Sequence, residues 1–230
     1  MTDAARQVVT LQVWTLPSSA VPGALARAQR AASRHRRRSA AGAGSFVKVL
    51  GTTHVGHFGP RDGNLRRWAV LTAGPVSAAV TDAFAARALE SWRVDLTPVS
   101  STGRWSKQEP FRPDPAAADP AKLMAVVTRA TLRPRRALTF WRAVPPITSE
   151  LTAQPGLRLA FGMGEAPIGL QGTFSLWDDA AAIRRFAYGS PRHNQAVADT
   201  TAIGWYGESL FARFAVLDSD GSIDGRNPAA

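Results

Sequence analysis

The order of strand-forming and helix-forming segments constrains the fold more than any other feature of the sequence. Segments rich in β-branched residues, or alternating apolar with polar ones, predict strands, and apolar residues every three or four positions predict helices. In the first half, the predicted strands are residues 8–16, 45–50, 68–72 and 94–99, and the predicted helices are residues 24–38 and 78–92. The first half therefore has the order β-α-β-β-α-β.

The second half of the sequence repeats this order. Its predicted strands are residues 124–132, 157–163, 172–177 and 210–217. Its predicted helices are residues 135–151, bent or ended by Pro145-Pro146, and a helix from Asp178 that breaks at 189–191 and resumes over 192–200. Two such units in tandem predict an α+β fold of two ferredoxin-like repeats.

These repeats divide the chain into three predicted parts. Residues 1–103 form the first ferredoxin-like half, and residues 123–230 form the second half. Residues 104–122, which include four prolines, form the predicted linker. Two such sheets can pack face to face into a barrel of the dimeric α+β type, which leaves a ligand cavity between a sheet and its helices.

The composition is that of a folded protein without thiol chemistry. Of the 230 residues, 45% are hydrophobic and 20% are charged, which excludes a disordered chain, a collagen-like fibre and a coiled coil. The chain has no cysteine, so disulfides, iron–sulfur clusters, thiolate-ligated metals and thiol nucleophiles are excluded. Catalysis must therefore use histidine, carboxylates, hydroxyls or a bound cofactor.

The charge balance is strongly basic, with a formal net charge of +11 from 28 Lys+Arg and 17 Asp+Glu. A basic run at residues 34–38 (RHRRR) is either a solvated helix end or a patch that attracts phosphates, an anionic membrane surface or an acidic partner. No aromatic residues alternate with this run, as a nucleic-acid groove requires. We therefore expect no nucleic-acid partner and allow a contact with a membrane surface.

No targeting or membrane-spanning segment is predicted. The first nine residues include Asp3 and lack the basic-then-apolar pattern of a signal peptide. A spanning helix needs about 20 consecutive apolar residues, and the best uncharged run, residues 69–81, is interrupted by Gly74 and Pro75. We therefore expect a soluble, cytoplasmic protein.

Histidines are the first candidates for chemistry. His54 and His57 have the i, i+3 spacing of a metal pair, but only Asp62 is near them, which favours a loop role. His193 follows the helix break at 189–191, where its imidazole can project into a cavity and ligate haem iron. The alternative for His193 is a structural role, which is the commoner one for a single histidine.

Other catalytic motifs are missing from the sequence. It contains no Walker loop, no GxSxG elbow and no HExxH helix. Glu165 follows a predicted strand, where a functional role and a turn-stabilising role are equally expected. The chain is therefore predicted to be a cofactor-dependent enzyme or a binding protein.

Several fragments in the second half together resemble one family. They are TRATL (128–132), FWRAVP (140–145), GMGEAPIGLQGTFSLWDD (162–179), RRFAYGSPRHNQAV (184–197) and GWYGESLFARFAVL (204–217). In their order and spacing these fragments resemble the spheroidene monooxygenase family, most clearly over residues 126–228. The resemblance implies a protein that binds haem b, oxygenates linear carotenoids and has a fold near the dimeric α+β barrel haem proteins.

The resemblance also implies roles for individual residues. His193 is implied as the proximal ligand of the haem iron. Candidates to pair with the haem propionates are Arg129, Arg192 and Arg213. Candidates to line the porphyrin pocket are Trp177, Phe186 and Trp205. Candidates for the distal side, as polar strand residues facing the iron, are Gln171, Ser175 and Thr128. Structural ion pairs are the alternative for the arginines, and core packing is the alternative for the aromatic residues.

The expected function is therefore that of a haem-dependent monooxygenase acting on an apolar or secondary-metabolite substrate. The chain carries no flavin or nicotinamide motif, so oxygenation needs an external electron donor or a peroxide. Two alternatives stay open: a haem-dependent dehydratase or nitrogen-oxidising biosynthetic enzyme, and a cofactor-free barrel that binds a hydrophobic ligand. A small-molecule substrate and a homo-oligomeric state are expected.

Overall fold

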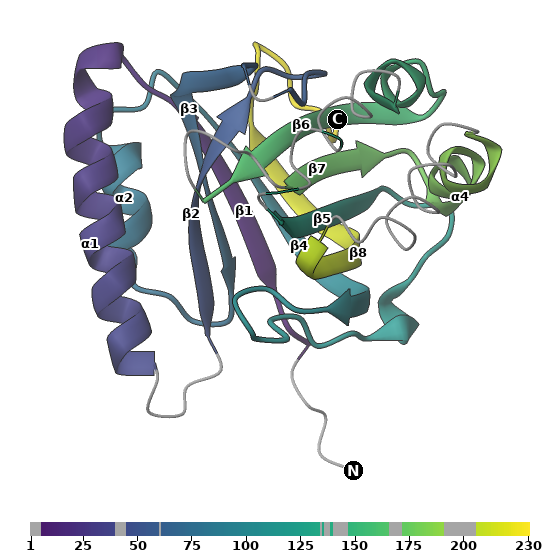
Figure 1. The fold of residues 1–230 in the computed structure, drawn as a ribbon, viewed down its shortest axis with the longest axis horizontal. Helices are drawn as coiled ribbons and strands as arrows, with labels where there is room; N and C mark the ends of the chain where they lie inside the picture. Colours follow the sequence, from purple (N-terminus) through teal and green to yellow (C-terminus); the bar gives the residue numbers. More distant parts are fainter. Residues whose placement is uncertain are drawn as a thin grey trace.

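The computed structural model contains eight antiparallel strands that close into a barrel (Figure 1). The structure describes residues 6–39, 45–59, 61–133, 135, 139, 147–165, 172–190 and 206–230. Around the barrel, the strands follow the order β1-β3-β2-β6-β7-β5-β8-β4, and β4 returns to pair with β1. The fold is therefore of the mixed α+β class, as the sequence predicts.

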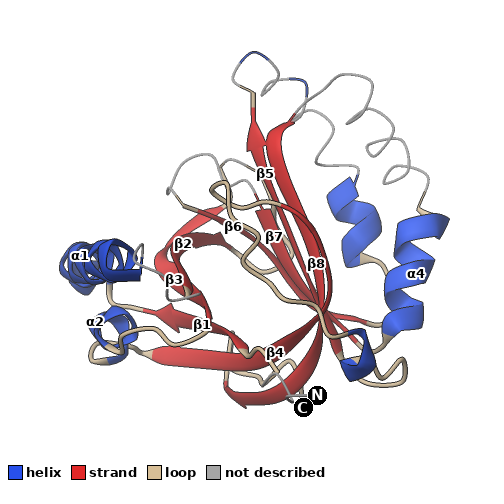
Figure 2. Cartoon of the chain, turned by 90° about the horizontal axis from the view of Figure 1, so that it is seen from below, coloured by secondary structure: helices blue, strands red, loops and turns tan. Residues whose placement is uncertain are grey.

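The first half of the chain contributes four strands and two helices. They are β1 (Val9–Thr15), α1 (Val21–Ser39), β2 (Phe46–Thr53), β3 (Gly63–Ala73), α2 (Ala79–Ala85) and β4 (Glu90–Gly103). Short 3-10 turns at Ser18–Ala20 and Pro115–Ala117 precede α1 and follow β4. Both helices lie on the same outer side of the barrel (Figure 2).

The second half contributes the other four strands. They are β5 (Met124–Leu132), β6 (Leu157–Gly164), β7 (Gly172–Trp177) and β8 (Tyr206–Gly221), with α4 (Ala180–Gly189) between β7 and β8. Residues 147–152 are also helical. The resumed helix predicted over 192–200 lies outside the described residues.

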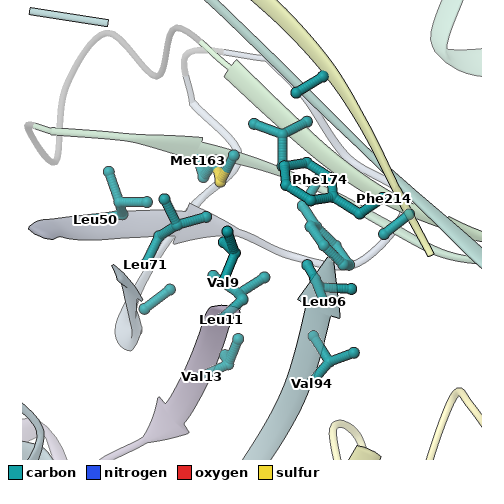
Figure 3. Close-up of a cluster of buried hydrophobic side chains, with 14 of the residues drawn as sticks. Val9, Leu11, Val13, Leu50, Leu71, Val94, Leu96, Met163, Phe174 and Phe214 are labelled. Atoms are coloured by element: carbon teal, nitrogen blue, oxygen red, sulfur yellow. The ribbon is translucent and has the colours of Figure 1, made fainter. Parts of the chain in front are cut away.

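The barrel interior is filled by one apolar cluster to which all eight strands contribute. Alternation along each strand explains the cluster, since every second side chain points inward. Leu11 on β1, Leu71 on β3 and Phe214 on β8 are each fully buried there (Figure 3). Phe161 and Phe174 stack with ring centroids 5.5 Å apart, so the interior is a packed core.

Two further apolar clusters lie between the outer faces of the strands and the helices. The alanines of α1 and Phe84 of α2 pack on the first-half strands, where Phe84 stacks on Trp14 at 5.3 Å. On the opposite side of the barrel, Ile183 of α4 and Leu151 pack on the second-half strands. The barrel is thus covered by helices on two sides (Figure 2).

Several predicted boundaries differ from the structure. The helix predicted over 78–92 ends at Ala85, because Glu90–Gly103 continues as strand β4 and Trp92 is buried inside the barrel. The strand predicted over 210–217 is longer at both ends, since β8 runs from Tyr206 to Gly221. Two aromatic residues of the predicted linker, Trp105 and Phe111, lie in the barrel core. The end of a strand can be polar and still pair with a neighbouring strand, so the local sequence does not show where the strand ends.

No helix in the described part of the chain is long and apolar enough to cross a membrane.

Candidate functional site

The outer face of β5, β7 and β8 carries the first group of candidate site residues. Val126 lies in register between Ser175 on β7 and Arg213 on β8. Two residues further along β5, Thr128 lies in register between Thr173 and Phe211. We call these six residues the helix-facing surface, because the flanking residues of the same strand face pack against α4.

Arg213 has an unusual environment on this surface. Its Nε is buried and has no hydrogen-bond partner among the described residues. Its guanidinium lies over the ring of Phe211, 5.3 Å from the centroid. A buried donor without an acceptor costs about 1–3 kcal/mol, and a carboxylate is the acceptor that matches a guanidinium best. Arg213 is therefore suited to hold an acidic group of a ligand.

Ser175 is buried on the other side of Val126 from Arg213 and has a defined orientation. The indole Nε1 of Trp177 donates a hydrogen bond to its Oγ at 2.9 Å. Because the hydroxyl accepts from Trp177, its own proton is free to point elsewhere. Ser175 can therefore act as a hydrogen-bond donor on this surface.

Trp177 is fixed by α4. Asp179 caps the helix, because its Oδ1 accepts from the backbone N–H of Ala182 at 2.6 Å. Phe186 lies on the same helix, and its ring is 5.7 Å from that of Trp177. Trp177 is only 2% exposed, so it both packs in the core and orients Ser175.

Thr128 and Thr173 add a pair of hydroxyls to the helix-facing surface. Their Oγ1 atoms are 2.7 Å apart on neighbouring strands. Two hydroxyls that share one hydrogen bond leave one proton to donate outward. The helix-facing surface therefore offers donors from a serine, a threonine pair and an arginine.

A second group of polar residues, which we call the barrel-end cluster, lies at one end of the barrel. It consists of Lys48, Trp105, Arg129, Glu165 and Glu208. Glu165 accepts hydrogen bonds from Lys48 Nζ at 2.9 Å and from Trp105 Nε1 at 2.6 Å. Arg129 donates to Glu208 at 2.6 Å and lies 3.5 Å from Glu165.

Burial and pairing shift the pKa values in the barrel-end cluster. Burial lowers the pKa of Lys48 below its usual value, although Glu165 acts in the opposite direction. Burial alone would raise the pKa of Glu165, but hydrogen bonds from Trp105 and Lys48 outweigh burial and hold that pKa below its usual range. The cluster therefore contains two cations and two anions that neutralise each other.

The structure separates the residues that the sequence singled out. Ser175, Arg213, Trp177 and Phe186 lie together on or beside the helix-facing surface. Arg129 points to the opposite side of β5 from Thr128 and pairs with two carboxylates of the chain. Four further residues lie outside the described part of the chain: Gln171, Arg192, His193 and Trp205. Their roles, and the propionate role of Arg129, stay predictions.

The remaining histidine pair gains no support as a metal site. The rings of His54 and His57 are 6.5 Å apart in an edge-to-face arrangement, and both residues are exposed. Among the described residues, no group of three or more His, Cys, Asp or Glu side chains is placed to hold a metal ion.

Sequence reasoning missed some of these polar residues. Thr173 lies two residues before Ser175, so strand alternation places both on one face and was a signal that could have found it. Lys48 and Glu208 gave no such signal, because their contacts join segments far apart in the sequence. Glu165, which the sequence left undecided, has three donors around it from three strands or loops.

Similarity to known proteins identifies the family of the chain. The chain is 34% identical over 195 residues to the spheroidene monooxygenase of Rhodobacter capsulatus, covering 80% of each chain. The chain belongs to the spheroidene monooxygenase family. It is also 35% identical to the spheroidene monooxygenase of Rubrivivax gelatinosus, and 32% identical to that of Cereibacter sphaeroides, of which it covers 59%. No protein-family model matches the chain.

Solved structures show the fold that this member of the spheroidene monooxygenase family shares. An aldoxime dehydratase matches with a TM-score of 0.50 and 14% identity, covering 94% of this chain and 83% of the other. An aldoxime dehydratase in complex with butyraldoxime matches with a TM-score of 0.51, also at 14% identity, covering 94% of this chain and 81% of the other. These similarities concern the fold alone.

Proposed function

We propose that the chain is a haem-dependent monooxygenase that oxygenates a linear polyene of the carotenoid class. Membership of the spheroidene monooxygenase family is the observation that carries the proposal, since three relatives share that name at 32–35% identity. The monooxygenase class follows from the family. The haem and the substrate class are the parts that we propose.

The helix-facing surface fits haem in two respects. Haem has a flat apolar ring with two carboxylates, and Arg213 offers a buried Nε that has no acceptor among the residues that the structure describes. Phe211, which is 40% exposed, offers apolar surface beside it. Arg213 would therefore hold a propionate, and His193, which lies outside the described residues, would hold the iron.

The bound haem would supply the iron at which dioxygen or a peroxide is activated. Ser175, held by Trp177, would donate a hydrogen bond toward the distal side, and the Thr128–Thr173 pair would do the same two residues along the strands. Apolar side chains of α4 and the strands would keep water out. Donors fixed before the reaction stabilise developing charge without rearrangement.

The proposed reaction balances with an external reductant. One dioxygen, two electrons and two protons convert a C–H bond into C–OH and release one water. A second cycle at the same carbon gives a geminal diol, which loses water to form a ketone. The two electrons of each cycle come from an external donor; with hydrogen peroxide as oxidant, none are needed. A small-molecule substrate and this donor are the partners that the proposal requires.

We also infer that the two halves of the chain are tandem ferredoxin-like repeats that form within one chain the barrel that two subunits form in dimeric relatives of this fold. The strand order β4-β1-β3-β2 in the first half matches β8-β5-β7-β6 in the second half. β4 and β8 both end in a glycine of positive φ, Gly103 and Gly221. Equivalent short bridges, at residues 105–108 and 223–226, follow these glycines.

The contacts at these bridges support the same inference. Glu208 accepts from the backbone N–H groups of Ser106 and Lys107 at 2.9 and 2.7 Å. On the opposite side, Glu90 accepts from the backbone N–H of Gly225 at 2.7 Å. Glu208 lies near the start of β8, in the second half, and caps the bridge that follows β4. Glu90 begins β4, in the first half, and caps the bridge that follows β8.

The test is turnover by the haem-loaded protein. The protein is given a chemical reductant, a linear carotenoid in detergent and isotopically labelled dioxygen. The proposal predicts hydroxylated and keto products that carry the label, at a rate that depends on the reductant. Recovery of unchanged carotenoid from reduced, haem-loaded protein would contradict it. Conversion of butyraldoxime to a nitrile, without consumption of dioxygen, would instead indicate a dehydratase.

A further inference from the structure

We propose that one face of α1 is a docking surface for anionic phospholipid headgroups. Five arginines form this face, which we call the arginine stripe: Arg27, Arg30, Arg34, Arg37 and Arg38. All five are exposed. Arg27, Arg30, Arg34 and Arg37 are spaced by three, four and three residues, and Arg38 follows Arg34 by four, which places the five along one side of the helix. The row from Arg27 to Arg37 is about 15 Å long at a rise of 1.5 Å per residue.

The buried alanine face of α1 fixes the direction of the stripe. Arg30 and Arg37 lie across the helix from this face, and the other three arginines lie between it and them. Ala24, Ala28, Ala31 and Ala32 are at most 5% exposed and pack against the first-half strands and α2. Because α1 is held along this alanine face, the stripe points outward from the barrel. α1 lies at the outer edge of the molecule in both views (Figures 1 and 2). A flat surface can therefore approach it.

The charges of the stripe are not neutralised within the described part of the chain. Residues 21–39 contain no acidic residue. The neighbouring helix α2 has one, Asp82, which is in none of the ion pairs of the described residues. Like charges three and four residues apart repel and destabilise a helix. A row of phosphates would remove this repulsion and accept two hydrogen bonds from each guanidinium.

Phospholipid is the partner that the observations favour over nucleic acid. No aromatic residue lies within 21–39 to stack on bases, so the stripe can contact only phosphates. The choice of lipid also rests on the proposed function, because a long apolar polyene partitions into bilayers rather than water. Docking of α1 on the headgroups would place the enzyme beside its substrate.

The experiment compares two variants of equal charge. One variant carries Arg27→Gln, Arg30→Gln, Arg34→Gln and Arg37→Gln in the stripe. The matched control carries Arg61→Gln, Arg112→Gln, Lys122→Gln and Arg226→Gln, all exposed and outside α1. Each variant lowers the formal net charge from +11 to +7, since four cations are removed. Glutamine keeps the helix propensity of arginine, and thermal unfolding checks that both variants fold.

Cosedimentation with vesicles gives the readout. We expect the wild type and the control to bind vesicles containing phosphatidylglycerol, and the stripe variant to bind on the order of a hundredfold more weakly. Raising the salt from about 0.1 M to about 1 M should release the wild type, because the screening length falls from about 10 Å to about 3 Å. Equal binding by the two variants, or equal binding of the wild type to pure phosphatidylcholine, would overturn the proposal.

Two further measurements separate this inference from others. Tighter binding of the wild type to duplex DNA than to the anionic vesicles, at the same salt, would overturn it in favour of a nucleic-acid surface. Haem uptake by the stripe variant should equal that of the wild type. Lost vesicle binding with intact haem uptake supports the docking surface, whereas missing haem in both proteins counts against the proposed function alone.

Discussion

Trp177 and Ser175 lie on the same face of β7, and the indole N–H of Trp177 donates to the Ser175 hydroxyl at 2.9 Å. Both residues are buried, Trp177 to 2% and Ser175 to 6% exposure. A tryptophan that packs against Phe186 of α4 thereby sets the direction of a hydroxyl on the helix-facing surface. Through this hydrogen bond, the packing of Trp177 in the core determines the orientation of the Ser175 hydroxyl.

This hydrogen bond predicts that the effects of substituting Ser175 and Trp177 on the free energy of unfolding are coupled. Ser175→Ala leaves the Trp177 N–H buried without its acceptor, which should cost about 1–3 kcal/mol in the free energy of unfolding. In Trp177→Phe the lost N–H leaves Ser175 free to rotate. A double-mutant cycle by urea unfolding should give a coupling of about 0.5–1.5 kcal/mol between the two residues. Additive losses would show that the bond contributes nothing.

Arg213 predicts opposite effects on stability and haem affinity. Arg213→Met removes the unpaired buried Nε, so the haem-free protein should be as stable as the wild type or more stable, by up to about 1 kcal/mol. The same variant should bind haem about ten- to a hundredfold more weakly, since a charge-assisted hydrogen bond of about 1.5–3 kcal/mol is lost. Urea unfolding and hemin titration measure the two effects.

The control for this prediction is Arg226→Met, which removes an exposed arginine whose side chain forms no ion pair with the other described residues. Its haem affinity should match the wild type. If Arg213→Met destabilises the haem-free protein and leaves haem affinity unchanged, Arg213 is a structural residue.

The barrel-end cluster predicts a dependence of stability on pH. The pKa of Glu165 is held below its usual value, so its charged form stabilises the fold above the unfolded pKa, and this contribution is lost as the pH falls through the folded pKa. Glu165→Gln should therefore be less stable than the wild type at neutral pH. The difference between the two proteins should shrink toward acidic pH, measured as thermal midpoints from about pH 7 to about pH 3.

Glu208 has a lowered pKa as well, so part of the acid sensitivity should remain in Glu165→Gln. Glu109→Gln, which removes an exposed carboxylate paired with Arg104, controls for the change in net charge. A constant stability difference between wild type and Glu165→Gln at every pH would contradict the role given to Glu165.

The cap of α4 predicts a simple stability series. Asp179→Ala removes the acceptor for the backbone N–H of Ala182 and should cost about 1 kcal/mol. Asp179→Asn keeps an acceptor and should cost only a fraction of that. If both substitutions cost the same, the charge of Asp179 matters more than its cap.

Most of the strands could be predicted from the sequence, because short runs of β-branched and other apolar residues mark them. β1, β5, β6 and β7 lie within one or two residues of the predicted ranges. The helix over 78–92 was predicted too long, since Trp92 fits the apolar pattern of a helix as well as that of a strand. Pairing with β1 and β8 makes β4 a strand in this region, and no local sequence pattern reveals that pairing.

The candidate site was only partly predictable for a related reason. Ser175 and Arg213 lie on strands that alternate clearly, so both could be assigned to a face. Arg129 was grouped with Arg213, but its position next to Thr128 turns it to the other side of β5, where Glu208 meets it. That contact joins residues 79 positions apart, and such partners are set by the closed barrel.

The most direct test of the proposed function is a hemin titration of the haem-free protein, followed by absorption. The proposal predicts saturable binding at about one haem per chain with a sharp Soret band, and a shifted or lost band in His193→Ala. A flat spectrum without saturable binding would contradict it. His193 would then be a structural residue, and the proposal of a haem enzyme would have to be abandoned.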